Sequence, residues 1–166
     1  MALTIGINTY VSLAEATKYF LNRLDSSAWD EAVDIDKESS LSTASNMLDE
    51  NTFIGQALDS NQPLAWPRQD ISYFDSRLNL LVRVPSGDFP MRLKVSVCEL
   101  ALHLLNNEDL LNNSGRVVDR ITVGPISIDD SSSESRAPPR IPIQVTNTIA
   151  PLIFRMMPPN VWWRAN

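Results

Sequence analysis

The sequence predicts a mainly α protein: a small antiparallel helical bundle with a β-hairpin projection and an extended C-terminal arm. Apolar residues recur at helical spacing in several segments, the spacing changes to two after Gly115, and a serine- and proline-rich stretch precedes an aromatic end. With 166 residues and 43% hydrophobic content, the chain can bury a core. We expect the bundle and its hairpin (about 116–129) in residues 1–130, a flexible hinge in 131–140, and a C-terminal helix and docking arm in 141–166.

The first part of the chain shows helix signals. Ser12-Leu13-Ala14-Glu15 has the form of a capping box, in which the serine accepts from first-turn amides and the glutamate reaches back. Apolar residues then follow at helical spacing. The segments expected to be helical are residues 12–24, residues 26–32, and a helix that begins at Asp34 or Asp36 and ends near Asn51.

Residues 52–90 show neither the apolar spacing of a helix nor the alternation of a strand, apart from a possible strand at 78–84. This connection contains QPLAWPR at residues 62–68, in which Pro67 keeps Trp66 out of the helical conformation. A tryptophan on such a loop is either an exposed anchor for a partner or a side chain that fixes the loop to the protein's own core. Tryptophan is highly buried on average, which favours the second interpretation.

A central helix is expected after Asp88-Phe89-Pro90, since proline is tolerated in the first turn. Its apolar stripe repeats at helical spacing and is wide enough for burial on nearly all sides. Cys98 and His103 lie on this helix. We interpret Cys98 as a buried core residue and His103 as a surface or hydrogen-bonded core residue, and we assign neither of them a site. The stripe consists of Met91, Val95, Cys98, Leu102 and Leu105.

After Gly115 the alternation predicts a pair of strands that continue beyond Gly124-Pro125. An isolated hairpin is marginally stable in water, so we expect a neighbouring subunit to complete it. The residues expected to make this inter-subunit contact are Val117, Ile121, Val123, Ile126 and Ile128.

The C-terminal part differs in charge from the rest. The formal net charge of −6 divides into −9 in residues 1–130 and +3 in residues 131–166. A short helix is expected from Pro142, followed by an extended, aromatic, basic end that is suited to docking on an acidic surface. The alternative is that its tryptophans fold back over the protein's own bundle. The expected docking residues are Arg155, Met156, Met157, Trp162, Trp163 and Arg164.

Several function classes are disfavoured. One cysteine and one histidine are too few ligands for most zinc or iron sites, and we expect no metal and no cofactor. The opening MALTIGINTY has no sustained apolar run, and no positive charge precedes Lys18, so we expect neither a signal peptide nor a membrane span. The acidic pairs Asp49-Glu50 and Asp129-Asp130 are explained by helix ends and turns. We therefore expect a protein that is not an enzyme.

Several segments together carry a resemblance to a known family. They are MALTIGINTYVSLAEATKYFLNRL, LAWPR, VSVCELALHLL, VGPISI and IPIQVTNTIAPLI. The chain resembles the small phage proteins described as DnaT-like single-stranded-DNA-binding proteins, which in gene order and fold are similar to head-tail connector (adaptor) proteins of tailed bacteriophages. In that family LAWPR looks like a structural signature, with Trp66 packing the loop onto the helices and Arg68 fixed nearby.

The resemblance implies a structural neck protein, made in the host cytoplasm and located in the virion. It would form a ring, expected to be twelve-fold, beneath the portal, connect head to tail, and line part of the DNA channel. The implied partners are the portal protein, a tail or tail-adaptor (nozzle) protein, other copies of itself, and double-stranded genomic DNA that passes without sequence-specific binding, with no membrane. An acidic body fits a channel wall that must not retain DNA.

The alternative is a single-stranded-DNA-binding protein of phage replication. Such proteins need a basic groove with interleaved aromatic residues. Most aromatic residues of the first half lie among acids, and only Trp162-Trp163-Arg164 has the required mixture. The negative charge of the body counts against this alternative.

Overall fold

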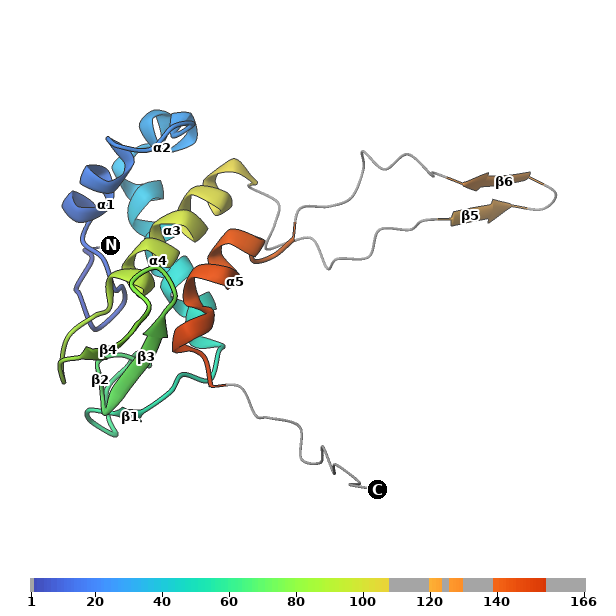
Figure 1. The fold of residues 1–166 in the computed structure, drawn as a ribbon. Helices are drawn as coiled ribbons and strands as arrows, with labels where there is room; N and C mark the ends of the chain where they lie inside the picture. The colour runs from blue at the N-terminus through green and yellow to red at the C-terminus, as the bar shows by residue number, and fades with distance from the viewer. Residues whose placement is uncertain (1, 108–119, 124–125, 130–138, 155–166) are drawn as a thin grey trace, which may run out of the picture.

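A computed structural model describes residues 2–107, 120–123, 126–129 and 139–154 (Figure 1). The helices are α1 (Leu13–Phe20), α2 (Ser27–Glu31), α3 (Asp34–Asp49), α4 (Met91–Asn106) and α5 (Ile143–Ile149), with a 3-10 turn η1 (Ala150–Leu152). The strands are β1 (Gln56–Ala57), β2 (Arg68–Gln69), β3 (Ile71–Asp75), β4 (Leu80–Val84), β5 (Arg120–Val123) and β6 (Ile126–Asp129).

The prediction of a mainly α helical bundle is wrong, because strands make up a substantial part of the fold. In the described residues they form three two-stranded antiparallel sheets: β1 with β2, β3 with β4, and β5 with β6. The first two sheets lie within residues 52–90. Strand β4 confirms the possible strand that was expected at 78–84. Strands β1 and β2 are too short to show a period, and the β3–β4 pair carries apolar residues on both faces, so its alternation is weak.

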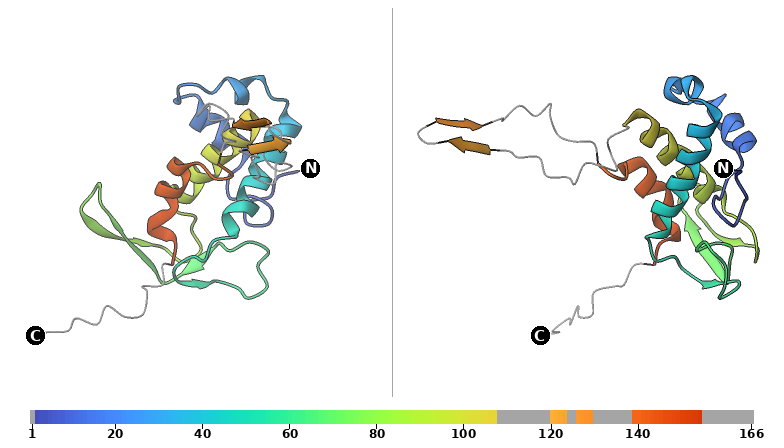
Figure 2. Two further views of the ribbon diagram at one scale, coloured as in Figure 1. Left: turned by 90° about the vertical axis from the view of Figure 1, so that its right-hand side faces the viewer. Right: turned by 180° about the vertical axis from the view of Figure 1, so that it is seen from behind.

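Helix α4 is the centre of the core and packs against α1, α2, α3 and α5 (Figures 1 and 2). The sequence predicted this helix. Of its predicted stripe only Cys98 and Leu102 are buried, while Val95 and Leu105 are half-buried and Met91 is exposed at the first turn. Close packing of large apolar side chains between the helices supplies the main stabilising force. The fully buried side chains of these helices include Leu41, Leu48, Leu93, Val97, Leu100 and Ile149.

The N-terminal helix is shorter than predicted. The capping box is confirmed, since the Ser12 Oγ accepts from the Glu15 amide at 3.2 Å and the Glu15 carboxylate accepts from the Ser12 amide at 3.0 Å. The helix ends at Phe20 rather than near residue 24, and the chain reverses at Asp25, whose φ is +61°. This turn places the ring of Trp29 against that of Phe20, with centroids 4.5 Å apart.

The QPLAWPR loop lies against the protein's own core. Trp66 is fully buried, and its ring meets that of Phe53 edge-on with centroids 5.7 Å apart. The Tyr10 hydroxyl donates to Asp49, which also accepts from the Ala65 amide at 2.8 Å. Burial raises the pKa of the Asp49 carboxyl, although these hydrogen bonds act in the opposite direction.

Arg68 holds this loop to the segment that follows α3. Its guanidinium donates to main-chain carbonyls from two separate stretches of the chain. Because these carbonyls accept from one side chain, the loop and the β1 region are fixed relative to each other. The carbonyls are those of Gly55 (2.7 Å), Ile54 (2.9 Å), Ala65 (3.1 Å) and Phe53 (3.3 Å).

The last described segment closes the fold beside β1. Helix α5 packs on α4, and Ile153 forms a β-bridge with Phe53. The Phe154 amide then donates to the Thr52 carbonyl at 2.7 Å. The end of the described chain is therefore tied to the core by main-chain hydrogen bonds.

The strand pair expected after Gly115 is present as β5 and β6. Ile121 faces Ile128 in the register, and Val123 faces Ile126. Figures 1 and 2 show this hairpin apart from the helices. Val117 lies outside the described residues, and contact of the hairpin with a neighbouring subunit stays a prediction.

Candidate nucleic-acid interface

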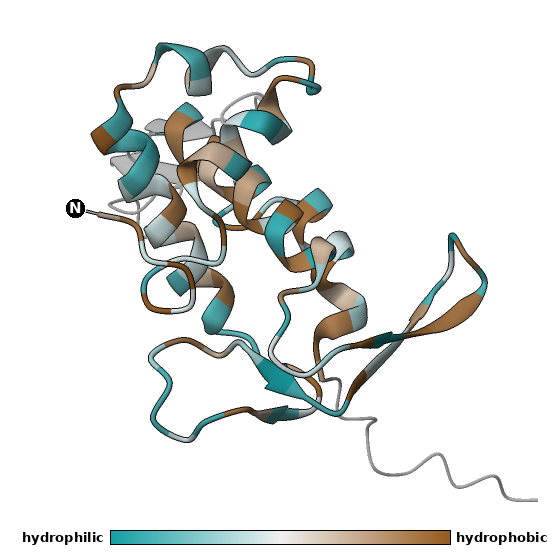
Figure 3. Ribbon diagram, turned by 90° about the vertical axis from the view of Figure 1, so that its left-hand side faces the viewer, coloured by the Kyte–Doolittle hydropathy of each residue, from teal (hydrophilic) through white to brown (hydrophobic). Residues whose placement is uncertain are grey.

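The hairpin formed by β3 and β4 has one face against the core and one face in solvent. Ile71 and Val84 pair with each other at its base, and both are buried. On the other face Phe74 pairs with Leu81, and these side chains are 55% and 67% exposed. Figure 3 shows hydrophobic residues along both strands of this hairpin, which extends away from the helices. A large apolar surface is therefore presented to solvent.

Asp75 fixes the turn of the hairpin to helix α4. Its carboxylate accepts from the Arg77 amide at 2.9 Å and lies 3.2 Å from the Arg92 guanidinium. Burial opposes the charge of Asp75, but these hydrogen bonds hold its pKa below the ordinary aspartate value. Arg92 also lies over the Tyr73 ring, 5.6 Å from its centroid. The base and the turn of the hairpin are thus held in place.

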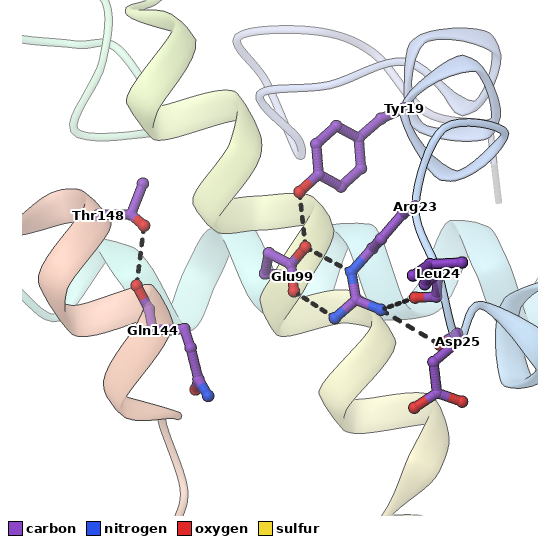
Figure 4. Close-up of polar contacts among 7 residues, drawn as sticks. All are labelled: Tyr19, Arg23, Leu24, Asp25, Glu99, Gln144 and Thr148. Carbon is purple, nitrogen blue, oxygen red and sulfur yellow. Dashed lines mark hydrogen bonds and ion pairs between the residues drawn. The ribbon is translucent and has the colours of Figure 1, made fainter. Parts of the chain in front are cut away.

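Two cations on this hairpin have no side-chain partner. Within residues 2–107 and 139–154, Arg77, Arg83 and Lys18 are the basic side chains that make no ion pair and no hydrogen bond. The others are engaged: Arg23 with Glu99 (Figure 4), Lys37 with Asp34, Arg92 with Asp75, Lys94 with Glu15, Arg140 with Glu50, and Arg68 with carbonyls. The hairpin therefore carries most of the uncompensated positive charge in this part of the chain.

We call the exposed residues Phe74, Arg77, Leu78, Leu80, Leu81 and Arg83 the hairpin surface. An exposed aromatic ring beside arginines can stack on a base while the guanidinium groups contact phosphates. The exposed leucines favour contact with another protein as well. Sequence analysis missed this surface. The signal was the stretch YFDSRLNLLVR, in which aromatic, aliphatic and basic residues are interleaved.

The predicted site residues are not gathered in one place. Trp66 and Arg68 lie together inside the fold, where Arg68 binds main-chain carbonyls and does not face solvent as a free cation. The strand residues Ile121 to Ile128 lie in β5 and β6. The expected docking arm, from Arg155 to Arg164, lies outside the described residues.

A groove of about 370 Å³ lies between α1 and α4. Its walls are mainly apolar, with Lys18 and the Glu15–Lys94 ion pair (2.7 Å) at its rim. Cys98 borders it but is 2% exposed, and burial raises the pKa of its thiol to about 12. Such a thiol is a poor nucleophile. The described residues contain no group of three or more metal-binding side chains.

No curated protein and no solved structure matches this chain. Among the described residues, no helix has the length and hydrophobicity that a membrane crossing requires. A family model described as "Putative DnaT-like ssDNA binding protein" matches residues 2–161. Because this match covers nearly the whole sequence, the chain belongs to that DnaT-like family.

Proposed function

We propose that this protein binds single-stranded DNA and that the hairpin surface makes the contact. The observation that carries the proposal is the exposed Phe74 with Arg77 and Arg83, which have no partner among the described residues. Base stacking on an aromatic side chain contributes about 1–3 kcal/mol per base and tolerates any sequence. The family to which the chain belongs supports the same function.

The charge of the molecule sets the strength of binding that we expect. Most cations in the described residues are already paired, and the net charge is −6. Neutralisation of phosphates supplies most non-specific affinity, so two arginines give weak, salt-sensitive binding. If both contact phosphates, the logarithm of the affinity should fall with the logarithm of salt concentration with a slope of about −1.4.

Fluorescence anisotropy with a labelled oligothymidylate tests this proposal. Phe74→Ala should weaken binding about 5- to 150-fold, the equivalent of about 1–3 kcal/mol. The double variant Arg77→Ala, Arg83→Ala should weaken binding and flatten the salt dependence. Absence of binding by the wild-type protein, or binding that ignores both sets of substitutions, would reject the proposal.

Matched controls exist elsewhere on the surface. Phe154 is 53% exposed, close to the 55% of Phe74, and does not lie on the hairpin. Lys18 is a cation without a side-chain partner in the described residues and lies on α1. Phe154→Ala and Lys18→Ala should leave the affinity for the oligonucleotide within about twofold of the wild-type value, since neither residue belongs to the hairpin surface.

A second candidate function is the neck component of a tailed phage, forming a ring beneath the portal. The observation that favours it is the acidic surface left after ion pairing, which suits a channel through which DNA passes without being retained. In this candidate the basic arm from Arg155 to Arg164 docks on the portal protein. Electron microscopy of the protein with and without portal tests it, because an annular stack would appear only with a connector.

A further inference from the structure

We infer that the hairpin surface of one copy docks on an acidic, apolar surface at the opposite end of a second copy. This second surface, the acidic end, consists of the exposed residues Leu24, Asp30, Glu31, Val33, Ile35 and Asp36. The inference goes beyond DNA binding, because it concerns how copies of the protein associate.

The acidic end has apolar side chains that folding does not explain. Val33 is the N-cap of α3 and makes no side-chain capping bond, although serine, threonine or aspartate at this position would stabilise the helix. It is 61% exposed, and Ile35 and Leu24 are exposed as well. These side chains neither cap a helix nor become buried in the monomer. Contact with a partner is the way in which they could stabilise a structure.

The same end is strongly negative. Residues 25–38 contain six acids and one cation, Lys37. That cation is already engaged, since its ammonium lies 3.9 Å from Asp34 and 5.7 Å from the centroid of the Trp29 ring. Some of this negative charge complements the N-terminal dipole of α3, but Glu31 is the last residue of α2, where the dipole disfavours an acid. A positively charged partner would reduce the repulsion among these acidic side chains.

The hairpin surface has the complementary composition. It combines Phe74 and three exposed leucines with two arginines that have no partner in the described residues. Apolar contact would supply most of the attraction, while the opposite charges would select the partner and make association sensitive to salt. The exposed leucines, which base stacking does not require, are explained by this contact.

The two surfaces lie at different ends of the molecule. Figures 1 and 3 show α2 and the turns beside it at one end and the β3–β4 hairpin at the other, with the long helices between them. A single contact between different surfaces of identical chains is heterologous. It leaves a free surface at each end of the pair, and association continues until a ring closes or a filament grows.

Sedimentation velocity over a range of protein concentrations, at 50 and 500 mM NaCl, tests the inference. We expect species larger than a dimer at low salt and weaker association at high salt. Val33→Ser should weaken association about tenfold through the lost apolar contact, while improving the helix cap. Ile143→Ser is the matched control, because Ile143 is 63% exposed at the start of α5 and lies on neither surface.

A charge exchange makes the test specific. Arg77→Glu with Arg83→Glu, and separately Asp30→Lys with Glu31→Lys, should each abolish self-association. Mixed together, the two variants should associate again, because the reversed hairpin of one fits the reversed end of the other. A wild-type monomer at all concentrations, or double variants that associate normally, would overturn the inference.

The outcome is separable from that of DNA binding. Val33→Ser leaves Phe74, Arg77 and Arg83 unchanged, so it should weaken association and keep the affinity for the oligonucleotide. Failure of the DNA proposal would instead appear as association without oligonucleotide binding. The oligonucleotide and a second copy would also compete for the hairpin surface. Added oligonucleotide should therefore reduce self-association of the wild-type protein.

Discussion

Glu99 joins the N-terminal helix to the central helix through hydrogen bonds from two side chains. The Tyr19 hydroxyl donates to it at 2.6 Å, and the Arg23 guanidinium donates to both carboxylate oxygens at 2.6 and 2.8 Å (Figure 4). Burial would raise the pKa of Glu99, but the hydrogen bonds from Arg23 and Tyr19 outweigh it and hold the pKa below the ordinary value. This carboxylate therefore stabilises the fold in its charged form.

We predict that Glu99→Gln lowers the free energy of unfolding by about 1–3 kcal/mol at pH 7, since hydrogen bonds to a charged group are lost. Because the folded pKa lies below the unfolded one, the wild-type contribution is complete above the ordinary glutamate pKa of about 4.3 and disappears as pH falls through the folded pKa. Urea denaturation between pH 3 and 7 should show the difference between wild type and variant shrinking with acidity. A difference that does not depend on pH would contradict this account.

At the scale of the element, Arg68 decides whether the QPLAWPR loop stays in place. Arg68→Lys keeps the charge but loses the planar fork that serves carbonyls from two stretches of chain. We predict a loss of about 1–3 kcal/mol in unfolding free energy, because several partly buried carbonyls lose their donor. Thermal or urea denaturation measures it. Arg77→Lys is the control and should change stability by less than about 0.5 kcal/mol.

The β3–β4 hairpin depends on Asp75 for its link to α4. In Asp75→Asn the charged partner of Arg92 is lost, while the side chain can still accept from the turn amides. We predict faster amide hydrogen exchange in Ile71–Val84 than in the wild-type protein, with little change in the centre of α4. Equal acceleration in both segments would show that Asp75 supports the whole core rather than the hairpin.

Elements differ in how far the sequence predicts them. Helix α4 follows from its apolar period, and the cap at Ser12 follows from local hydrogen-bonding chemistry. Of the β3–β4 hairpin, β4 confirms the strand that was expected at 78–84, whereas β3 and its pairing with β4 were not predicted, since Leu80 and Leu81 are adjacent apolar residues on opposite faces and give no alternation. The same pair is exposed, so the two adjacent leucines that obscure the hairpin in the sequence also mark the candidate site.

At the scale of the whole molecule, the structure shows which charged side chains neutralise one another, and the sequence does not. The sequence indicates an acidic body and a basic end, but it does not reveal which cations are neutralised by contacts between distant segments. Arg23 with Glu99 and Arg140 with Glu50 join residues that are far apart along the chain. In residues 2–107 and 139–154 this pairing leaves Arg77, Arg83 and Lys18 as the cations without a partner, and two of the three lie on the hairpin. Composition alone could not locate the candidate interface, because it does not show these ion pairs.

The described fold is closed before the C-terminal arm begins. Ile153 bridges Phe53, and the Phe154 amide donates to the Thr52 carbonyl, so the final main-chain contacts join the chain end to the core. We predict that a chain lacking residues 156–166 keeps its melting temperature within about 2 °C, a change of less than about 1 kcal/mol.

Binding experiments on that truncated chain test whether residues 156–166 bind a partner. We expect this basic, tryptophan-containing segment to contact partners rather than to stabilise the fold. If the neck proposal is right, the truncated chain loses binding to portal protein at unchanged stability. If the hairpin surface alone holds DNA, its affinity for oligothymidylate stays equal to that of the full chain. A melting temperature lowered by about 5 °C or more would instead place Trp162 and Trp163 in the core, because loss of buried aromatic side chains costs several kcal/mol.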